Sequence, residues 1–229
     1  MNKFKFFAAL CCTALLFAAC DKNDEPKATT GTENGHDWVD LGLSVKWATC
    51  NMGADNPEAY GNYYAWGETT TKETYLWENY KYGLSSELTK YCSDSEYGKD
   101  GFTDGLITLE AADDAATSKW GGLWRMPTAE DWTELRENCT WTRTDDYNGT
   151  GVAGCIVASK TNGNSIFLPA AGYYTDTEYR HAGSYGYYWS SSLDTDSPDY
   201  AWLVYFYPER QTWTQDNRCF ALPIRPVLK

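Results

Sequence analysis

Tryptophan and tyrosine have to supply much of the core of this chain, because aliphatic side chains are comparatively few. The 229 residues include 11 Trp and 18 Tyr, and all of these rings lie downstream of residue 37. Such rings bury a large apolar area, but the indole N–H and the phenol O–H need hydrogen-bond partners once they are buried. We therefore predict that most rings are structural. The remainder would be available as contact surface for a sugar or a protein.

Alternating apolar residues predict strands at both ends of the domain. Period two runs from Val39 to Trp47, which is typical of a half-buried strand. Residues 200–207 are apolar on both faces, which favours a central strand, whereas Pro223 and Pro226 favour an edge or a bulge for the last strand. Further strands are predicted for residues 62–67, 154–159, 165–169, 187–192 and 219–227.

Two helices are predicted between these strand regions. Residues 108–118 have a small apolar face and are followed by two glycines, which end a helix. Residues 128–138 begin with Thr128, whose hydroxyl can cap the first turn, and Asp131 can reach back as in a capping box. Two helices, strands at both ends and many turns predict an α+β fold.

Two tyrosine-rich loop segments are the predicted contact surfaces. Residues 68–105 show little periodicity, and a long loop of this kind often carries function. Rings in mobile loops give a large contact area at modest entropic cost. The candidate ligand-binding residues are Tyr75, Trp77, Tyr80 and Tyr82 in the first segment, and Tyr173, Tyr174, Tyr179, Arg180, His181 and Tyr185 in the second.

Residues 1–19 have the layout of an export signal. Lys3 and Lys5 precede an apolar run that is too short for a membrane-spanning helix, which needs ~20 residues. Cys20 follows Leu-Phe-Ala-Ala, which resembles the lipobox of bacterial lipoproteins. We therefore predict that Cys20 is the lipid-anchored first residue of the mature protein. A signal that is cleaved without lipidation, or an uncleaved anchor, is the alternative.

Residues 20–36 are polar, and we predict a flexible tether that leads to one folded domain over residues 37–229. The acidic run after Cys20 resembles the surface-export signal of Bacteroides-type lipoproteins, although an ordinary solvated linker has the same composition. We expect an outer-membrane lipoprotein that faces either the periplasm or the cell exterior.

The net charge of −13 argues against nucleic acid as a partner, since phosphate binding requires a basic face. An acidic membrane surface would also repel the domain, so the lipid would provide the attachment. A compartment beyond the inner membrane permits disulfides. The five cysteines after Cys20 are odd in number, so at least one thiol is free and the pairing stays open. They are Cys50, Cys92, Cys139, Cys155 and Cys219.

Six motifs, in order along residues 37–229, resemble a known family. They are Val39-Asp-Leu-Gly-Leu-Ser-Val-Lys-Trp, Tyr64-Ala-Trp-Gly-Glu, Trp120-Gly-Gly-Leu-Trp-Arg-Met-Pro-Thr, Ile166-Phe-Leu-Pro-Ala-Ala-Gly-Tyr, Gly186-Tyr-Tyr-Trp-Ser-Ser-Ser and Ile224-Arg-Pro-Val. As an ordered set they resemble the Fibrobacter succinogenes major paralogous domain, which is abundant in Bacteroides-type bacteria. The resemblance implies a C-type lectin-like fold and no settled molecular function. Within the motifs we expect core packing and a buried polar clamp from Trp66, Glu68, Trp120, Trp124, Trp189 and Arg225.

Residues 124–132 are also similar to the Arg-Leu-Pro-Thr-x-x-Glu-Trp signature of formylglycine-generating enzymes and their relatives, which share that fold. Those enzymes bind copper through a cysteine pair near the C-terminus, where Cys219 stands alone in this chain. His181 is the one histidine beyond the tether, and no Gly-x-Ser-x-Gly elbow occurs, so no Ser–His–acid arrangement can be argued. No catalytic residues are predicted.

Calcium is the one metal for which candidate ligands can be named. Asp194, Asp196 and Asp199 offer hard oxygen ligands in a loop, as calcium prefers. A solvated acidic cluster is the alternative, and no other cofactor is predicted.

The anchor, the tether and the loop-borne rings favour a membrane-anchored, surface-exposed, non-catalytic binding module that recognises a glycan or a protein. One alternative is a polysaccharide-acting enzyme, which would need two facing carboxylates ~5–10 Å apart. The other alternative is a structural or adhesion component of the cell envelope.

Overall fold

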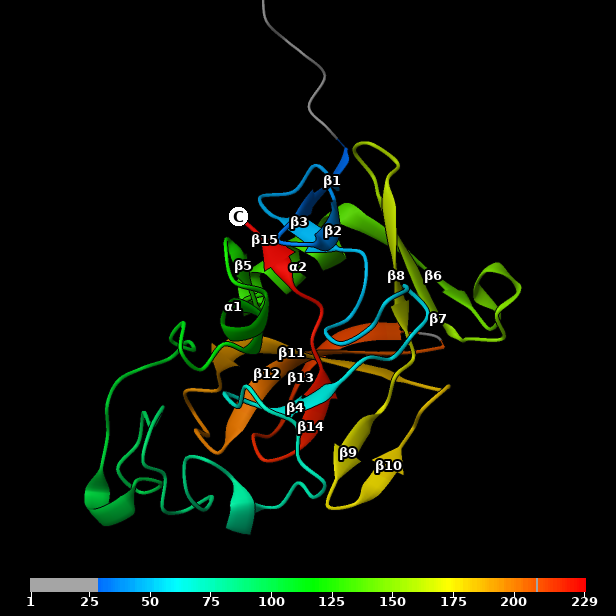
Figure 1. Cartoon of the computed structure of the whole chain (residues 1–229). Coiled ribbons are helices and arrows are strands. Elements are labelled where there is room, and N and C mark those ends of the chain that lie inside the picture. The colour runs from blue at the N-terminus through cyan, green and yellow to red at the C-terminus, as the bar shows by residue number, and fades with distance from the viewer. Residues whose placement is uncertain (1–28, 209) are drawn as a thin grey trace, which may run out of the picture.

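A computed structural model describes residues 29–208 and 210–229 (Figure 1). The predicted export signal, Cys20 and the first part of the tether lie outside the described residues. None of the helices in the described ranges is long and apolar enough to cross a membrane. The fold is α+β, as predicted, and antiparallel sheets dominate it.

Four antiparallel sheets and two α-helices make up the described part of the chain (Figure 1). The first sheet contains, in spatial order, β1 (Thr30–Glu33), β2 (His36–Val39), β3 (Lys46–Ala48), β15 (Val227–Leu228) and β5 (Trp124–Arg125). The second contains β10 (Glu178–Arg180), β9 (Tyr173–Thr175), β14 (Ala221–Pro223) and β4 (Tyr63–Ala65). The third contains β11 (Gly186–Leu193), β12 (Tyr200–Tyr207) and β13 (Arg210–Asn217), and the fourth contains β6 (Cys139–Thr144), β7 (Gly154–Ser159) and β8 (Ser165–Pro169).

Residues 30–36 belong to the folded domain, so the predicted tether extends too far along the chain. β1 pairs with β2 through the turn Asn34-Gly35, where both residues have a positive φ, 49° and 80°. Asn-Gly is the favoured pair for a two-residue hairpin of this type. This dipeptide was the sequence signal that could have moved the domain boundary upstream.

Residues 39–47 do not form the single strand predicted from their alternation. A turn separates β2 from β3, and the Asp40 carboxylate accepts a hydrogen bond from the amide of Gly42 at 2.7 Å. The apolar positions are nevertheless buried, including Leu41 at 0% and Val45 at 4% exposure. The alternation therefore predicted burial correctly, while the local turn interrupts the strand.

The last predicted strand is also divided, and its edge placement is wrong. β14 lies between β9 and β4, and β15 lies between β3 and β5, so both pieces are interior strands. Pro223 and Pro226 stand where the chain crosses from one sheet to the other. A residue without an N–H is tolerated there because no ladder hydrogen bond is required of it.

The buried polar clamp predicted at Arg225 is present in this crossing. Its side chain is 0% exposed, and Nε donates to Oδ1 of Asn51 at 2.9 Å. Nη1 donates to the main-chain oxygens of Ala48 (3.2 Å) and Thr49 (3.0 Å). Arg225 thereby joins the C-terminal segment to the chain that follows β3.

Helix α2 (Ala129–Asn138) confirms the prediction, with Thr128 and Asp131 forming the capping box. Helix α1 (Ala115–Trp120) is much shorter than the predicted residues 108–118. The helix begins after Asp114, whose carboxylate accepts from the amide of Thr117 at 2.9 Å. Thr108 instead forms a bridge with β11.

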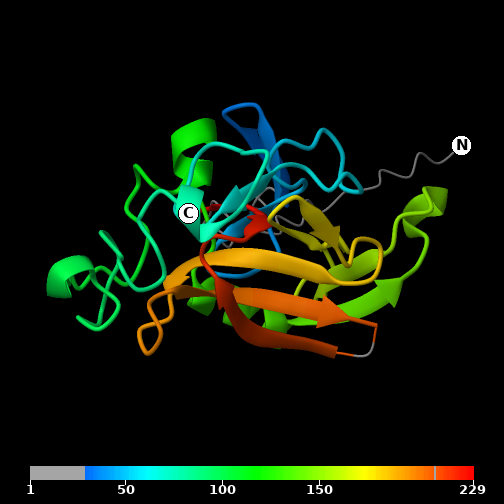
Figure 2. The same cartoon turned by 90° about the horizontal axis from the view of Figure 1, so that it is seen from below.

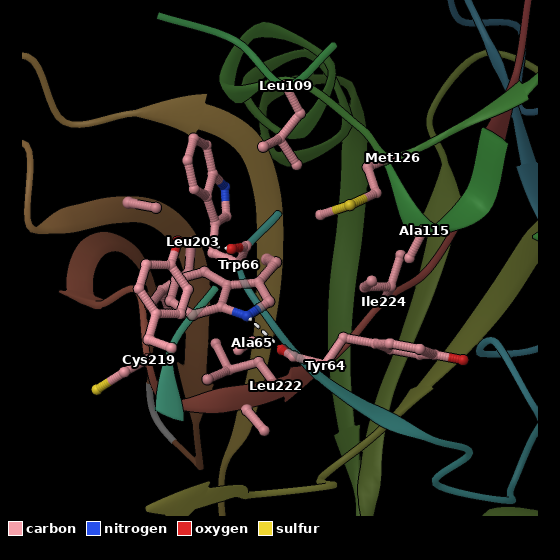
Figure 3. Close-up of a cluster of buried hydrophobic side chains, with 14 of the residues drawn as sticks. Tyr64, Ala65, Trp66, Leu109, Ala115, Met126, Leu203, Cys219, Leu222 and Ile224 are labelled. Atoms are coloured by element: carbon pink, nitrogen blue, oxygen red, sulfur yellow. Dashed lines mark hydrogen bonds between the residues drawn. The ribbon is translucent and has the colours of Figure 1, made fainter. Parts of the chain in front are cut away.

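The centre of the third sheet is covered on both faces, as the apolar pattern of residues 200–207 predicted. Leu203 and Trp189 pack into one cluster with β4 and β14, while Val204 and Phe206 pack into another with α2 and the fourth sheet. Figure 3 shows residues of the first cluster, among them Ala65, Leu203 and Leu222. The indole N–H of Trp189 donates to the main-chain oxygen of Tyr64 at 2.9 Å, and that of Trp66 donates to Ser190 at 2.9 Å.

The five cysteines that follow Cys20 are all free thiols in the described structure. Cys50 is half-buried and the other four are buried. Burial raises the pKa of Cys139 and Cys155 to about 11, so both stay as thiols at neutral pH. The domain is therefore held together by packing and hydrogen bonds rather than by disulfides among these residues.

Candidate binding surfaces

Residues 68–105, here called the tyrosine lobe, have almost no regular secondary structure beyond two short 3-10 turns, as predicted. Their rings do not form a contact surface, however. Tyr80 and Tyr82 are each 5% exposed, and their hydroxyls donate to the main-chain oxygens of Trp66 (2.8 Å) and Gly67 (2.9 Å). The prediction for these two residues is wrong, because the lobe folds back on β4 and buries them.

The tyrosine lobe packs around Arg218, a residue from the turn after β13 that is 0% exposed. Its Nε donates to the hydroxyl of Tyr80 at 2.9 Å, and Nη1 donates to the main-chain oxygens of Tyr91 (2.9 Å) and Pro198 (2.6 Å). The guanidinium carbon also lies 4.9 Å from the ring centroid of Trp66 and 5.3 Å from that of Tyr80. A buried charge is thus solvated by carbonyl oxygens and ring faces.

A second polar residue from outside the lobe, Asp113, also binds its side chains. Its carboxylate accepts hydrogen bonds from Lys81 (2.7 Å), Lys90 (2.6 Å) and the hydroxyl of Tyr91 (2.7 Å). Burial alone would raise the pKa of Asp113, but these hydrogen bonds outweigh it and hold the pKa well below its usual range. The lobe is therefore a structural unit stabilised by polar contacts.

The other two candidates of the first segment lie at its edge. Tyr75 is 3% exposed, and its hydroxyl donates to the main-chain oxygen of Tyr63 at 2.8 Å. Trp77 is half-exposed and packs edge-on against Tyr80 at 5.3 Å. The ring of Tyr75 lies 6.4 Å from that of Tyr174 in the second segment, and both rings border a cavity described below.

The second segment forms the hairpin β9–β10, which lies beside β14 in the second sheet (Figures 1 and 2). The turn of the hairpin meets the tyrosine lobe, because Asp176 and Tyr75 exchange two main-chain hydrogen bonds of 3.0 Å. Its two faces carry different rings, because side chains alternate along a strand. Tyr174 pairs with Tyr179 and stacks on it at 4.7 Å, whereas Tyr173 pairs with Arg180 on the opposite face. The hairpin therefore contributes to two separate surfaces.

One surface is a set of rings that we call the aromatic patch. The contacts include Tyr187 with Tyr205 at 4.8 Å, Tyr173 with Tyr187 at 4.9 Å and His181 with Tyr185 at 5.0 Å. His181 is exposed and the remaining rings are half-exposed. Its members are Tyr173, His181, Tyr185, Tyr187, Tyr205, Tyr207 and Phe220.

The sequence identified three members of this patch and missed four. Tyr187, Tyr205, Tyr207 and Phe220 lie in or beside strands, where apolar residues were expected to be core. A signal was present, because residues 205 and 207 alternate with buried Val204 and Phe206 at the end of β12. Tyr205 packs against the edge of the core cluster that contains Leu203, and both Tyr205 and Tyr207 remain only half-buried.

Charged groups near the patch are few. Arg180 is exposed and pairs with Glu178 on the same short strand. Asp216 of β13 lies near Tyr173 and Tyr187, and burial raises its pKa. The same burial raises the pKa of both tyrosines, which therefore stay protonated and neutral. The patch is a largely uncharged platform of rings.

The other surface is a groove made of three neighbouring cavities. Cavities of about 420 and 480 Å³ share Asn62 and Thr71, and a smaller cavity of about 150 Å³ shares Trp120 with the first. Volumes of several hundred Å³ are typical of ligand sites. Trp120 is half-buried: it packs against the core, with its ring 5.0 Å from that of Trp124, and also lines this groove, so the predicted core packing holds in part.

The predicted calcium ligands do not form a ligand set. No group of three or more His, Cys, Asp or Glu side chains that could hold a metal ion occurs within residues 29–208 and 210–229. Asp194 accepts a hydrogen bond from the amide of Asp196 at 3.1 Å. Burial raises the pKa of Asp199, and its Oδ1 has no hydrogen-bond partner among the described residues.

Residues 142–227 match a family that is described as a domain of unknown function (DUF8237). The matched segment contains every residue of the aromatic patch and leaves out the tyrosine lobe. No curated protein and no solved structure matches the chain.

Proposed function

We propose that the protein is a membrane-anchored, non-catalytic binding lipoprotein that recognises a glycan or a protein through the aromatic patch. The lipid on Cys20 would hold it at the outer membrane, facing either the periplasm or the cell exterior. In this proposal the domain has a C-type lectin-like fold and belongs with the Fibrobacter succinogenes major paralogous domains. Two helices, antiparallel sheets and long loops support that fold, and the ordered motifs of the sequence support that family.

The aromatic patch is the observation that carries the proposal. A soluble domain usually buries large rings, and a contiguous set of half-exposed rings is typical of a binding surface. Tyrosine gives a broad, rigid contact area at low conformational cost and is enriched at interaction hot spots. Tyr187 and Tyr205 are also paired across β11 and β12, so the platform is built on regular structure that holds it rigid.

The carboxylates of the groove argue against the alternative of a glycosidase. Glu73 lines one of the two larger cavities, and Asp37 and Asp55, which line the small cavity, are both exposed. A glycosidase places two carboxylates on opposite sides of the scissile bond and raises the pKa of the acid by burial. Such a facing, buried pair is absent from these three cavities in the part of the chain that the structure describes.

The test is a binding screen with the full-length protein purified in detergent. We expect specific binding on a glycan array or on a panel of purified envelope and extracellular proteins. The double variant Tyr205→Ala/Tyr207→Ala should abolish that binding, and Tyr97→Ala, which removes a half-buried ring from the tyrosine lobe, should leave it unchanged. Absence of binding across both panels, or equal binding by the patch variant, would contradict the proposal.

The location has a test of its own. Protease treatment of intact cells should release the domain if it faces the exterior. Protection in intact cells followed by cleavage after outer-membrane permeabilisation would place it in the periplasm. Recovery of an unlipidated protein in the soluble fraction would contradict the anchor.

A further inference from the structure

The groove is open along its length, which distinguishes it from a closed pocket. Its three cavities are joined through shared lining residues, Trp120 at one junction and Asn62 with Thr71 at the other. A small compact ligand would occupy one cavity and leave the others empty. An arrangement in series suits a linear chain whose successive units each occupy one cavity.

Aromatic rings are placed along the groove and are held rigidly. Trp120 stacks on His36 with ring centroids 3.7 Å apart and an angle of 8° between the planes. Tyr64 borders the middle cavity and is 4% exposed. At the far end Tyr174 is fixed by its stack on Tyr179. Rings that are already ordered lose little entropy when a ligand packs on them, which favours binding.

Uncharged hydrogen-bonding groups lie between these rings. Asn62 carries an amide that both donates and accepts, and Thr70 and Thr71 carry hydroxyls that do the same. All three side chains are exposed to solvent. Amides and hydroxyls alternating with ring faces match the alternating hydroxyl groups and C–H faces of sugar units.

The loop of residues 51–62 is closed in a way that fixes Asn62. The main-chain N–H of Asn62 donates to the main-chain oxygen of Met52 at 2.7 Å. Gly53 has a φ of 76°, and a Cβ there would lie 2.4 Å from Nδ2 of Asn62. Gly61 has a φ of 74°, and a Cβ there would lie 2.3 Å from the oxygen of Met52. Both glycines are therefore needed for the loop to bring Asn62 to the junction.

The charges around the groove favour an uncharged ligand. The ammonium of Lys72 is directed at Glu68 (2.9 Å) and at the main-chain oxygen of Asn79 (3.0 Å), so its charge is used within the lobe. Lys119 is then outnumbered by the carboxylates that border the cavities, which are Asp37, Asp55 and Glu73. A polyanionic chain would be repelled both by these groups and by the net charge of −13.

We infer that this groove binds a linear, neutral glycan chain, at a site distinct from the aromatic patch. Sugar rings pack on Trp120 and Tyr174, and their hydroxyls bond to Asn62, Thr70 and Thr71. The inference does not depend on what the aromatic patch binds, because the two surfaces use opposite faces of the hairpin β9–β10.

The test is titration calorimetry of the full-length protein in detergent with neutral hexasaccharides, namely cellohexaose, mannohexaose, xylohexaose and maltohexaose, and with hexagalacturonate as the polyanion. Thr71→Trp places a ring at the junction of the two larger cavities, and Asn62→Ala removes the central amide. Thr103→Trp, at an exposed threonine of the tyrosine lobe, is the matched control. Thermal unfolding of each variant confirms that it is folded.

At least one neutral hexasaccharide should bind, and Thr71→Trp should weaken that binding by about tenfold or more, which corresponds to ~1.4 kcal/mol. Asn62→Ala should weaken it several-fold, and Thr103→Trp should not change it. The inference is overturned if no neutral hexasaccharide binds, if hexagalacturonate alone binds, or if the groove variants bind as well as the parent. Loss of hexasaccharide binding in Tyr205→Ala/Tyr207→Ala would also overturn it, since the sugar would then occupy the patch. Binding of a protein to the patch without any sugar in the groove would leave the proposed function intact.

Discussion

In the tyrosine lobe each buried ring is matched to a polar partner, whereas in the aromatic patch the rings mainly contact one another. The hydroxyls of Tyr80 and Tyr82 donate to main-chain oxygens, and Arg218 lies between the rings. Tyr187 and Tyr205 meet ring against ring at 4.8 Å on the surface of a sheet. Two tyrosine-rich segments with similar composition therefore pack their rings in different ways. The partner of the hydroxyl, rather than the number of rings, distinguishes core from contact surface.

The largest expected effect comes from removing the cation of the lobe. Arg218→Ala should lower the free energy of unfolding by about 3–5 kcal/mol, because it leaves several buried carbonyl oxygens unpaired and opens a cavity. Denaturant unfolding measures this change. Arg180→Ala, at an exposed arginine beside the patch, is the control and should stay within ~0.5 kcal/mol. Equal effects at the two positions would show that the lobe is not organised around Arg218.

A smaller effect is expected when one hydroxyl is deleted in each region. Tyr80→Phe should destabilise the protein by ~1–3 kcal/mol, because the oxygen of Trp66 and Nε of Arg218 both lose a partner in the interior. Tyr205→Phe on the patch should change stability by less than ~0.5 kcal/mol. Denaturant unfolding of both variants measures the two effects. Equal effects would show that the hydroxyls of the lobe and of the patch contribute equally to stability.

The acid sensitivity of the lobe should depend on Asp113. Its folded-state pKa is lowered, so the stability it contributes is complete above the unfolded pKa of ~3.9 and is lost as pH falls from there towards the folded value. Asp113→Asn should therefore flatten the fall in stability below about pH 4. Unfolding free energies measured from pH 5 to pH 2.5 give the slope. A slope identical to that of the parent protein would contradict the assignment.

The smallest effect is expected at the thiols. Cys50 is half-buried and should react with a thiol reagent in the native state, while the four buried cysteines should react only after unfolding. Cys50→Ser should change stability by less than ~0.5 kcal/mol, measured by thermal unfolding. Rapid reaction of all five thiols in the folded protein would show that its interior is less well packed than described.

Local patterns in the sequence predicted several of the elements, although β6 and β13 were missed. The capping box at Thr128, the hairpin formed by β7 and β8, and the two-sided burial of residues 200–207 all follow from side-chain spacing within one segment. The same kind of reasoning failed where turn chemistry overrides periodicity, as at Asp40 and Asp114. It also failed to place the last strand at the correct position in a sheet, because strand order is decided by distant segments.

The candidate surfaces were harder to predict, for a physical reason. Whether a ring in a loop is exposed depends on what packs against it from elsewhere in the chain. Arg218 buries Tyr80 across a separation of 138 residues, and no local pattern near either residue indicates this contact. The motif around Trp120 predicted its packing against the core, but not that the same ring would also line a groove.

The hairpin β1–β2 has a mechanical consequence for an anchored protein. β1 is the edge strand of its sheet, and Thr30, its first residue, pairs with Val39. A pull on the chain from upstream acts on that pair first. The residue pairs between β1 and β2 would therefore separate one after another, rather than all at once. The released strand would lengthen the connection by up to ~3.3–3.6 Å per residue while β3 stays held by β15. In the proposed anchored protein, drag on a captured ligand would thus be absorbed by a short segment that can re-form, before the load reaches the proposed binding surfaces.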